Sequence, residues 1–150
     1  MDRNATWPDP TTLRGIRPRL LGYEIAELGA GRSRIHWTPT PELANPVGQV
    51  HGGFVGLIVD DTCGCAITSL FEDFRQCPTA SMSIDYLRPI AIGALYVCRG
   101  VVVRAGRTAT VVDATIADAD GRLAARGTCN FSVELDGSPL KGFTALAPLE

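Results

Sequence analysis

A chain of 150 residues with 45% hydrophobic and 20% charged residues is most simply one ordinary globular domain, and it is far from the profile of a disordered polypeptide. Its 14 basic and 16 acidic side chains give a net charge of −2 at pH 7, which argues against binding to nucleic acid or to an anionic membrane surface. No apolar run approaches the roughly 20 residues of a membrane span, and the N-terminal residues lack the apolar segment of a secretory signal, so we expect a cytoplasmic protein.

Residues 1–19 contain three prolines and few apolar residues, so we expect an N-terminal arm that lies over the surface. Two strands are predicted next, over residues 21–28 and 32–38, and the glycine-rich turn between them indicates a hairpin. A proline-containing connection then leads to the stretch NPVGQVHGGFVGLIVDD, residues 45–61. This stretch is unusual because it ends an apolar run with two adjacent aspartates.

Residues 52–72 show no period-two alternation and are too long for one strand, so they predict a helix of about 20 residues, roughly 30 Å long. Gly53, Gly56 and Gly64 would each destabilise the interior of a helix by about 1 kcal/mol relative to alanine. Such glycines fit a helix that lies close against a sheet. We therefore expect this helix to be buried on several sides.

From residue 79 onward the pattern alternates with a period of two. The stretch TASMSIDYLRP predicts one strand, and three longer strands are predicted over residues 94–104, 107–117 and 122–135, with reversals at RAGR and DADG. Residues 136–150 form a tail that the pattern does not place. Six strands and one long helix predict an α+β fold in which an antiparallel sheet wraps around the helix. The exposed edges of such a sheet favour a dimer with a continuous sheet.

The cysteines and histidines do not suggest a metal centre. The five cysteines form no CxxC pair, and no histidine lies near them at metal-ligand spacing. Neither a glycine-rich phosphate loop nor a GxSxG elbow occurs. We expect reduced, mostly buried thiols, no metal site and a mechanism without a cofactor; the cysteines are Cys63, Cys65, Cys77, Cys98 and Cys129.

Four motifs in order, NPVGQVHGGFVGLIVDD, SIDYLRP, RAGR and DADGRLAARGT, resemble the hotdog-fold acyl-CoA thioesterases of the phenylacetate-pathway type, in the 4-hydroxybenzoyl-CoA thioesterase superfamily. The resemblance covers about residues 20–134. It implies a hotdog fold, in which an antiparallel sheet of five to six strands wraps a long central helix, and a thioesterase domain over residues 20–135. The expected reaction is hydrolysis of an acyl-CoA, with a short, medium or aromatic acyl group, to the free acid and CoA.

The resemblance also implies site residues. The HGG signature falls on His51, Gly52 and Gly53, and the catalytic carboxylate, nine residues after the histidine, falls on Asp60. The family asparagine falls on Asn45, and the hydroxyl residue that helps to position water falls on Thr79, with Ser81 as the second choice. Residues expected to contact CoA are Arg88, Arg104, Gly106 and Arg107. In this family the carboxylate of one subunit and the histidine-glycine segment of the other form each site, so a homodimer is implied, and by resemblance a homotetramer of two dimers.

The chemistry of these residue types agrees with that reaction. Thioester hydrolysis needs an activated water or a nucleophile, and a group that stabilises the charge developing on the carbonyl oxygen. A glycine N–H at a helix N-terminus can approach a carbonyl without obstruction, and such a donor is worth roughly 3 to 4 kcal/mol in the transition state. We assign this role to Gly52. Asp60 would be a general base or a nucleophile, and the sequence leaves both open.

Structural alternatives exist for each of these residues. Asp60 could pair with an arginine, Asn45 could support the turn before Pro46, and Thr79 could be an ordinary strand residue. His51 could orient the loop, and Arg104 and Arg107 could be solvated hairpin charges. Consecutive helical residues point about 100° apart, so both aspartates cannot serve one site equally; the face formed by positions 54, 57, 58, 61 and 65 would turn Asp61 toward the apolar side. Two other functions stay open, a hotdog hydratase or dehydratase and a non-catalytic acyl-thioester-binding module.

Overall fold

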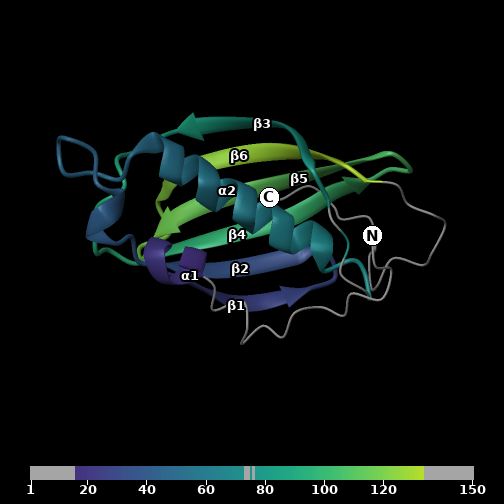
Figure 1. Cartoon of the computed structure of the whole chain (residues 1–150), viewed down its shortest axis with the longest axis horizontal. Helices are drawn as coiled ribbons and strands as arrows, with labels where there is room; N and C mark the ends of the chain where they lie inside the picture. Colours follow the sequence, from purple (N-terminus) through teal and green to yellow (C-terminus); the bar gives the residue numbers. More distant parts are fainter. Residues whose placement is uncertain (1–15, 73–74, 76, 134–150) are drawn as a thin grey trace.

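The computed structural model describes residues 16–72, 75 and 77–133. Within them six strands form one antiparallel sheet, and the longest helix lies across one face of it (Figure 1). The helices are α1 (Ile16–Leu21), the short 3-10 helix η1 (Pro41–Leu43) and α2 (Gly52–Thr68); the strands are β1 (Tyr23–Gly29), β2 (Arg32–Trp37), β3 (Thr79–Tyr86), β4 (Tyr96–Ala105), β5 (Ala109–Asp118) and β6 (Leu123–Ser132). The predicted α+β fold with one helix wrapped by an antiparallel sheet is confirmed.

The sheet has the strand order β1-β2-β4-β5-β6-β3, so β1 and β3 are its edges. Strand β3 follows α2 in the sequence and crosses to the far edge, where it pairs with β6. Most of β3 is exposed, including large side chains such as Met82 at 41% and Tyr86 at 57%. An edge strand with exposed apolar side chains is an unused template for pairing with another strand.

Helix α2 is shorter than predicted because its C-terminal turn tightens. The Leu70 and Phe71 N–H groups donate to the carbonyls of Ile67 and Thr68, three residues back, as in a 3-10 turn. Ser69 contributes to this end: its Oγ donates to the Ala66 carbonyl at 2.7 Å and accepts the Gly31 N–H at 2.9 Å. The helix therefore ends at Thr68, and the apolar residues after it enter the core as a turn.

The face of α2 that packs on the sheet differs from the predicted one. Of the predicted positions only Ile58 is buried, whereas Phe54, Leu57, Asp61 and Cys65 are half-buried. The physical reason is that small residues line the contact, which lets the helix approach the sheet closely. The buried residues are Val55, Gly56, Ile58, Val59, Thr62, Cys63, Ala66 and Ile67.

Glycines on both sides of this contact set its closeness. A Cβ on Gly100 of β4 would lie 2.6 Å from the Thr62 carbonyl oxygen and 2.5 Å from Ser33 Oγ. A Cβ on Gly56 would lie 3.3 Å from Ile84 Cδ1 of β3. Gly56 thus fits the expectation of a helix packed against a sheet, whereas Gly64 does not, because a Cβ there would meet nothing within 4 Å.

The first strand begins two residues later than predicted. Residues Ile16–Leu21 form α1, and β1 starts at Tyr23, whereas a strand from residue 21 was expected. Leu21 is buried, and its carbonyl accepts the Trp37 Nε1–H at 2.8 Å, which holds the end of α1 over β2. Gly22, at φ +77°, then turns the chain into β1. Residues 1–15 and the tail at 136–150 lie outside the described residues.

Candidate active site

The loop that precedes α2 is organised by Asn45 and capped by His51. Asn45 Oδ1 accepts the N–H groups of Val47, at 3.0 Å, and Gln49, at 3.1 Å. His51 is the N-cap of α2, and its Nδ1 accepts the Gly53 N–H at 3.1 Å. Both side chains therefore shape the segment that presents Gly52, which is the structural alternative considered for each. Because Nδ1 accepts this hydrogen bond, the N–H of a neutral His51 ring in this geometry is on Nε2.

Gly52 begins α2, and its N–H makes no hydrogen bond within the described residues. The N-terminal N–H groups of a helix lack intrahelical acceptors and carry part of the helix dipole's positive charge, so this donor suits an anionic oxygen. The carbonyl of the same residue accepts the Tyr86 hydroxyl at 3.0 Å. Tyr86 lies at the end of β3, and sequence reasoning assigned it no function, although it stands in the SIDYLRP motif.

Asp60 and Thr79 are hydrogen-bonded to each other within one chain. Thr79 Oγ1 donates to Asp60 Oδ1 at 2.7 Å, joining the middle of α2 to the start of β3. A β-bulge between Thr79 and Ser81 makes this possible, because it places Thr79 opposite the inward-facing Phe131. Ser81 instead lies opposite Asn130, whose Nδ2 donates to its hydroxyl at 3.0 Å on the face away from α2. The structure thus brings Thr79, and not Ser81, to Asp60.

Asp61 points in a different direction from Asp60. Its Oδ2 accepts the Tyr23 hydroxyl of β1 at 2.9 Å, near the opposite edge of the sheet from β3. The two neighbouring carboxylates are therefore divided between the two sheet edges. Asp61 anchors β1 to α2, and Asp60 is the carboxylate beside β3.

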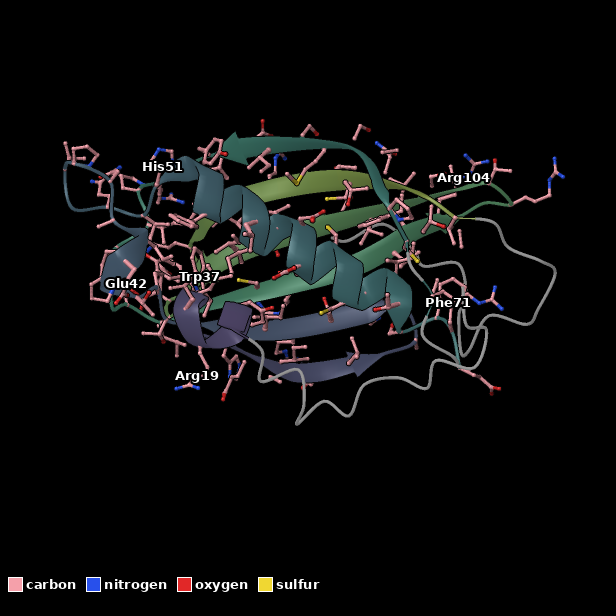
Figure 2. The ribbon with its side chains drawn as sticks, viewed as in Figure 1. Arg19, Trp37, Glu42, His51, Phe71 and Arg104 are labelled. Atoms are coloured by element: carbon pink, nitrogen blue, oxygen red, sulfur yellow. The ribbon has the colours of Figure 1, made fainter. Side chains whose placement is uncertain are left out.

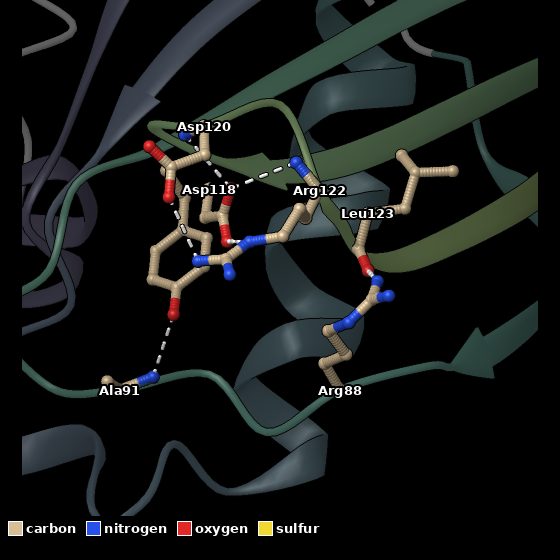
Figure 3. Close-up of polar contacts among 7 residues, drawn as sticks. Arg88, Ala91, Asp118, Asp120, Arg122 and Leu123 are labelled. Atoms are coloured by element: carbon tan, nitrogen blue, oxygen red, sulfur yellow. Dashed lines mark hydrogen bonds and ion pairs between the residues drawn. The ribbon is translucent and has the colours of Figure 1, made fainter.

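Arg88 lies close to Gly52. Its Nη1 donates to the Leu123 carbonyl, beside the turn in which Arg122 pairs with Asp118 at 2.8 Å and Asp120 at 3.0 Å (Figure 3). The hydrogen bond from the Arg122 backbone N–H lowers the pKa of Asp118, and the Arg122 side chain adds to the effect, so the Asp118 carboxylate stays ionised.

A cavity of about 270 Å³, here called the Gly52 cavity, lies beside Gly52. It is lined by Val50, Gly52, Val55, Tyr86, Leu87, Arg88, Pro89 and Ile90.

The other predicted CoA contacts lie elsewhere. Arg104, at the end of β4, is at the opposite end of the molecule from His51 (Figure 2). Arg107 and Gly106 belong to the same β4–β5 turn, where the Gly106 N–H donates to the Ala109 carbonyl at 2.9 Å. Within one chain, the structure does not bring this turn together with Gly52.

Several of the cysteines, which are potential reactive groups, are buried. Cys63 follows Asp60 by three residues, but hydrogen bonding with the Cys129 thiol and burial both raise its pKa, so it stays protonated. The thiols of Cys63, Cys98 and Cys129 are buried. Among the residues that the structure describes, no group of three or more His, Cys, Asp or Glu side chains could hold a metal ion. No helix in this part of the chain is long and apolar enough to cross a membrane.

Comparison with known proteins identifies the family. The model of the thioesterase superfamily matches residues 47–125, just over half of the chain. A phenylacetic acid degradation-related protein from Ralstonia eutropha JMP134 is 31% identical, with a TM-score of 0.72 over 85% of this chain and 92% of that one. A hypothetical thioesterase protein from Streptococcus pneumoniae TIGR4, solved with coenzyme A, is 26% identical, with a TM-score of 0.70 over 75% of this chain and 86% of that one.

A third relative is 1,4-dihydroxy-2-naphthoyl-CoA thioesterase 2 of Arabidopsis thaliana, 30% identical over 62% of this chain and 59% of that protein. The motifs that suggested a hotdog thioesterase thus coincide with a family match and with folds of the same topology. The chain therefore belongs to the thioesterase superfamily, with the hotdog fold and the activity of a thioester hydrolase.

Proposed function

We propose that this protein hydrolyses acyl-CoA thioesters with short, medium or aromatic acyl groups, using Asp60 and the Gly52 N–H. The observation that carries the proposal is the 2.7 Å hydrogen bond from Thr79 to Asp60, which fixes a half-buried carboxylate beside an exposed sheet edge. Relatives support the substrate class, since one was solved with coenzyme A and another is named for an aromatic acyl-CoA.

The two catalytic groups of one chain are too far apart to act on one thioester. Gly52 and Asp60 are eight residues apart on α2, which is about 12 Å of helical rise. An oxyanion donor and a base must both lie within about 3 Å of the reacting atoms or their water. A complete site therefore needs Asp60 from one chain and Gly52 from another.

Pairing of two β3 strands would bring these groups together. Thr79 and Tyr86 are the first and last residues of β3, and they bond Asp60 and Gly52 respectively. When two such strands pair antiparallel about their centres, the first residue of one lies opposite the last residue of the other. Asp60 of one chain then lies beside Gly52 of the second chain, and the symmetry generates two identical sites.

In this site the thioester carbonyl oxygen accepts the Gly52 N–H, and the positive end of α2 stabilises the negative charge that develops there. Asp60, oriented by Thr79, takes a proton from water as the water attacks the carbonyl carbon, or attacks that carbon itself to form an anhydride that water then opens. The C–S bond breaks and CoA leaves as a thiolate. Arg88, beside the Gly52 cavity, and Arg104 with Arg107, at the β4–β5 turn, are the proposed contacts of the CoA phosphates.

The proposal includes assembly and location. The exposed β3 edge supports a homodimer, and the resemblance extends this to a tetramer of two dimers. The net charge of −2 gives no reason to expect nucleic acid or membrane partners. Buried reduced cysteines such as Cys63, Cys98 and Cys129 suit the reducing cytoplasm, which is the location we propose.

The test of Asp60 is the variant Asp60→Asn, measured by release of free thiol from acetyl-, hexanoyl- and benzoyl-CoA. We expect kcat to fall at least about 100-fold, because loss of a general base removes about 10² to 10⁴ in rate. The matched control is Asp113→Asn, whose carboxylate also accepts a threonine hydroxyl at 2.7 Å, from Thr128 on the other face of the sheet. An active Asp60→Asn enzyme, or a wild-type enzyme that hydrates enoyl-CoA and releases no thiol, would refute the proposal.

The shared site is tested by mixing inactive variants. Asp60→Asn and Gly52→Val, unfolded and refolded together, form mixed dimers in which one site carries both changes and the other carries neither. About half of the dimers are mixed in a random assembly, so about one quarter of the wild-type activity should return. If each chain held a whole site, mixing would restore nothing.

A further inference from the structure

Tyr86 is bonded to the Gly52 peptide although its side chain is largely exposed. Its hydroxyl donates to the Gly52 carbonyl at 3.0 Å, and its ring lies against Gly52, where an added Cβ would be 3.4 Å from Cε1. With 57% of the residue exposed, burial of the ring gives little stabilisation to the fold. The Tyr86 side chain therefore contacts mainly the Gly52 peptide group and does not form part of the hydrophobic core.

The Gly52–Gly53 peptide is held at both of its polar ends. Tyr86 donates to its carbonyl, and its N–H, which belongs to Gly53, donates to His51 Nδ1 at 3.1 Å. The peptide links two side chains in one hydrogen-bonded chain, in which each bond polarises the next. The neighbouring N–H, that of Gly52, is left without an acceptor among the described residues. Fixing one peptide plane limits rotation about the Gly52 backbone and so fixes the direction of this free N–H.

Tyr86 also forms part of the wall of the Gly52 cavity, together with Val50, Leu87 and Ile90. Tyr86 therefore contacts Gly52, which carries the free N–H and the bonded carbonyl, and also lines the cavity beside it. We propose that Tyr86 is a positioning residue, which holds the Gly52 peptide so that the Gly52 N–H meets the thioester carbonyl bound beside the cavity. This inference rests on the proposed function and adds a residue that acts on the reaction through Gly52.

The test separates the hydroxyl from the ring. Tyr86→Phe keeps the ring wall and removes one hydrogen bond, so kcat for the best acyl-CoA of the panel should fall about fivefold, the effect of one typical hydrogen bond, with KM unchanged. Tyr86→Ala also removes the wall, so KM should rise in addition. In NMR spectra the Gly53 amide proton of Tyr86→Phe should move upfield, because its peptide is less polarised.

Tyr23→Phe is the matched control, since its phenol also donates to an acceptor on α2, Asp61 Oδ2 at 2.9 Å, from the opposite sheet edge. We expect its kcat to equal that of wild type. Wild-type kcat in Tyr86→Phe, or an equal loss in both variants, would overturn the role of Tyr86. The proposed function fails on a different result, an active Asp60→Asn enzyme, so the two failures are distinguishable.

Discussion

The hydrogen bond between Thr79 and Asp60 gives the sharpest prediction, because it can be removed almost without change of shape. Thr79→Val keeps the β-branched form that suits a strand and replaces with a methyl group the hydroxyl that donates to Asp60 Oδ1 at 2.7 Å. Hydrogen bonds to charged groups contribute about 1.5 to 3 kcal/mol, and the exposure of Thr79 places this one at the lower end. A loss of about 1.5 kcal/mol from the transition state corresponds to about a tenfold fall in kcat.

The assay is thiol release under saturating acyl-CoA, with Thr128→Val as the matched control. Thr128 Oγ1 donates to Asp113 Oδ1 at the same 2.7 Å, between β6 and β5, so its loss should affect stability and leave kcat unchanged. In the Asp60→Asn background, Thr79→Val should have no further effect, since the bond acts through the carboxylate. The reasoning is refuted by a Thr79→Val enzyme with wild-type kcat, or by additive losses in the double variant.

Two further predictions concern stability. Gly64→Ala should raise the free energy of unfolding by about 0.5 to 1 kcal/mol, because a Cβ there meets nothing within 4 Å. Gly100→Ala should lower the free energy of unfolding by about 1 to 3 kcal/mol, because its Cβ would lie 2.5 Å from Ser33 Oγ. Urea titrations at pH 7 measure both changes. Burial raises the pKa of Cys98 to about 12, so as the pH rises the unfolded chain loses the Cys98 proton at a lower pH than the folded chain does. The free energy of unfolding should therefore fall between about pH 9 and pH 12. A Cys98→Ala protein whose urea midpoint has the same pH dependence would contradict this.

Much of the fold followed from local patterns in the sequence. The alternation of β4, β5 and β6 placed their ends within three residues, since strands with one buried face have a strict period of two. The buried face of α2 did not follow, because this helix is apolar or small on most sides and its periodicity favours no single face. The face of α2 that packs on the sheet carries Thr62, Cys63 and Ala66, whose small side chains allow close approach. No local sequence pattern indicates that this face, and not another, is buried.

The candidate site likewise combines residues that the sequence indicated with contacts that only the tertiary structure shows. The resemblance named Asp60 and Thr79 as site residues but not their contact within one chain, and the bulge that turns Thr79 inward and Ser81 outward is a tertiary feature of β3 and β6. Tyr86 was passed over because an aromatic residue in a strand normally indicates core packing, and only the structure shows its hydroxyl at the Gly52 carbonyl. The CoA contacts assigned to Arg104 and Arg107 are still predictions, since one chain does not bring them to Gly52.

In the proposed dimer, strand β3 would connect catalysis to assembly, because it is hydrogen-bonded to α2 at both of its ends. Thr79 holds Asp60 at one end and Tyr86 holds Gly52 at the other, so the seven-residue span between these two strand positions fixes the offset between base and oxyanion donor. A single helix holds Gly52 and Asp60 about 12 Å apart, and the proposed antiparallel pair of β3 strands would bring the proposed base of one chain to the proposed oxyanion donor of the other. A shift of two residues in the pairing of the two β3 strands would move the groups apart by roughly 7 Å while leaving each chain's fold unchanged. If the proposed dimer forms, activity therefore depends on the register of the edge strand as well as on the identity of the site residues.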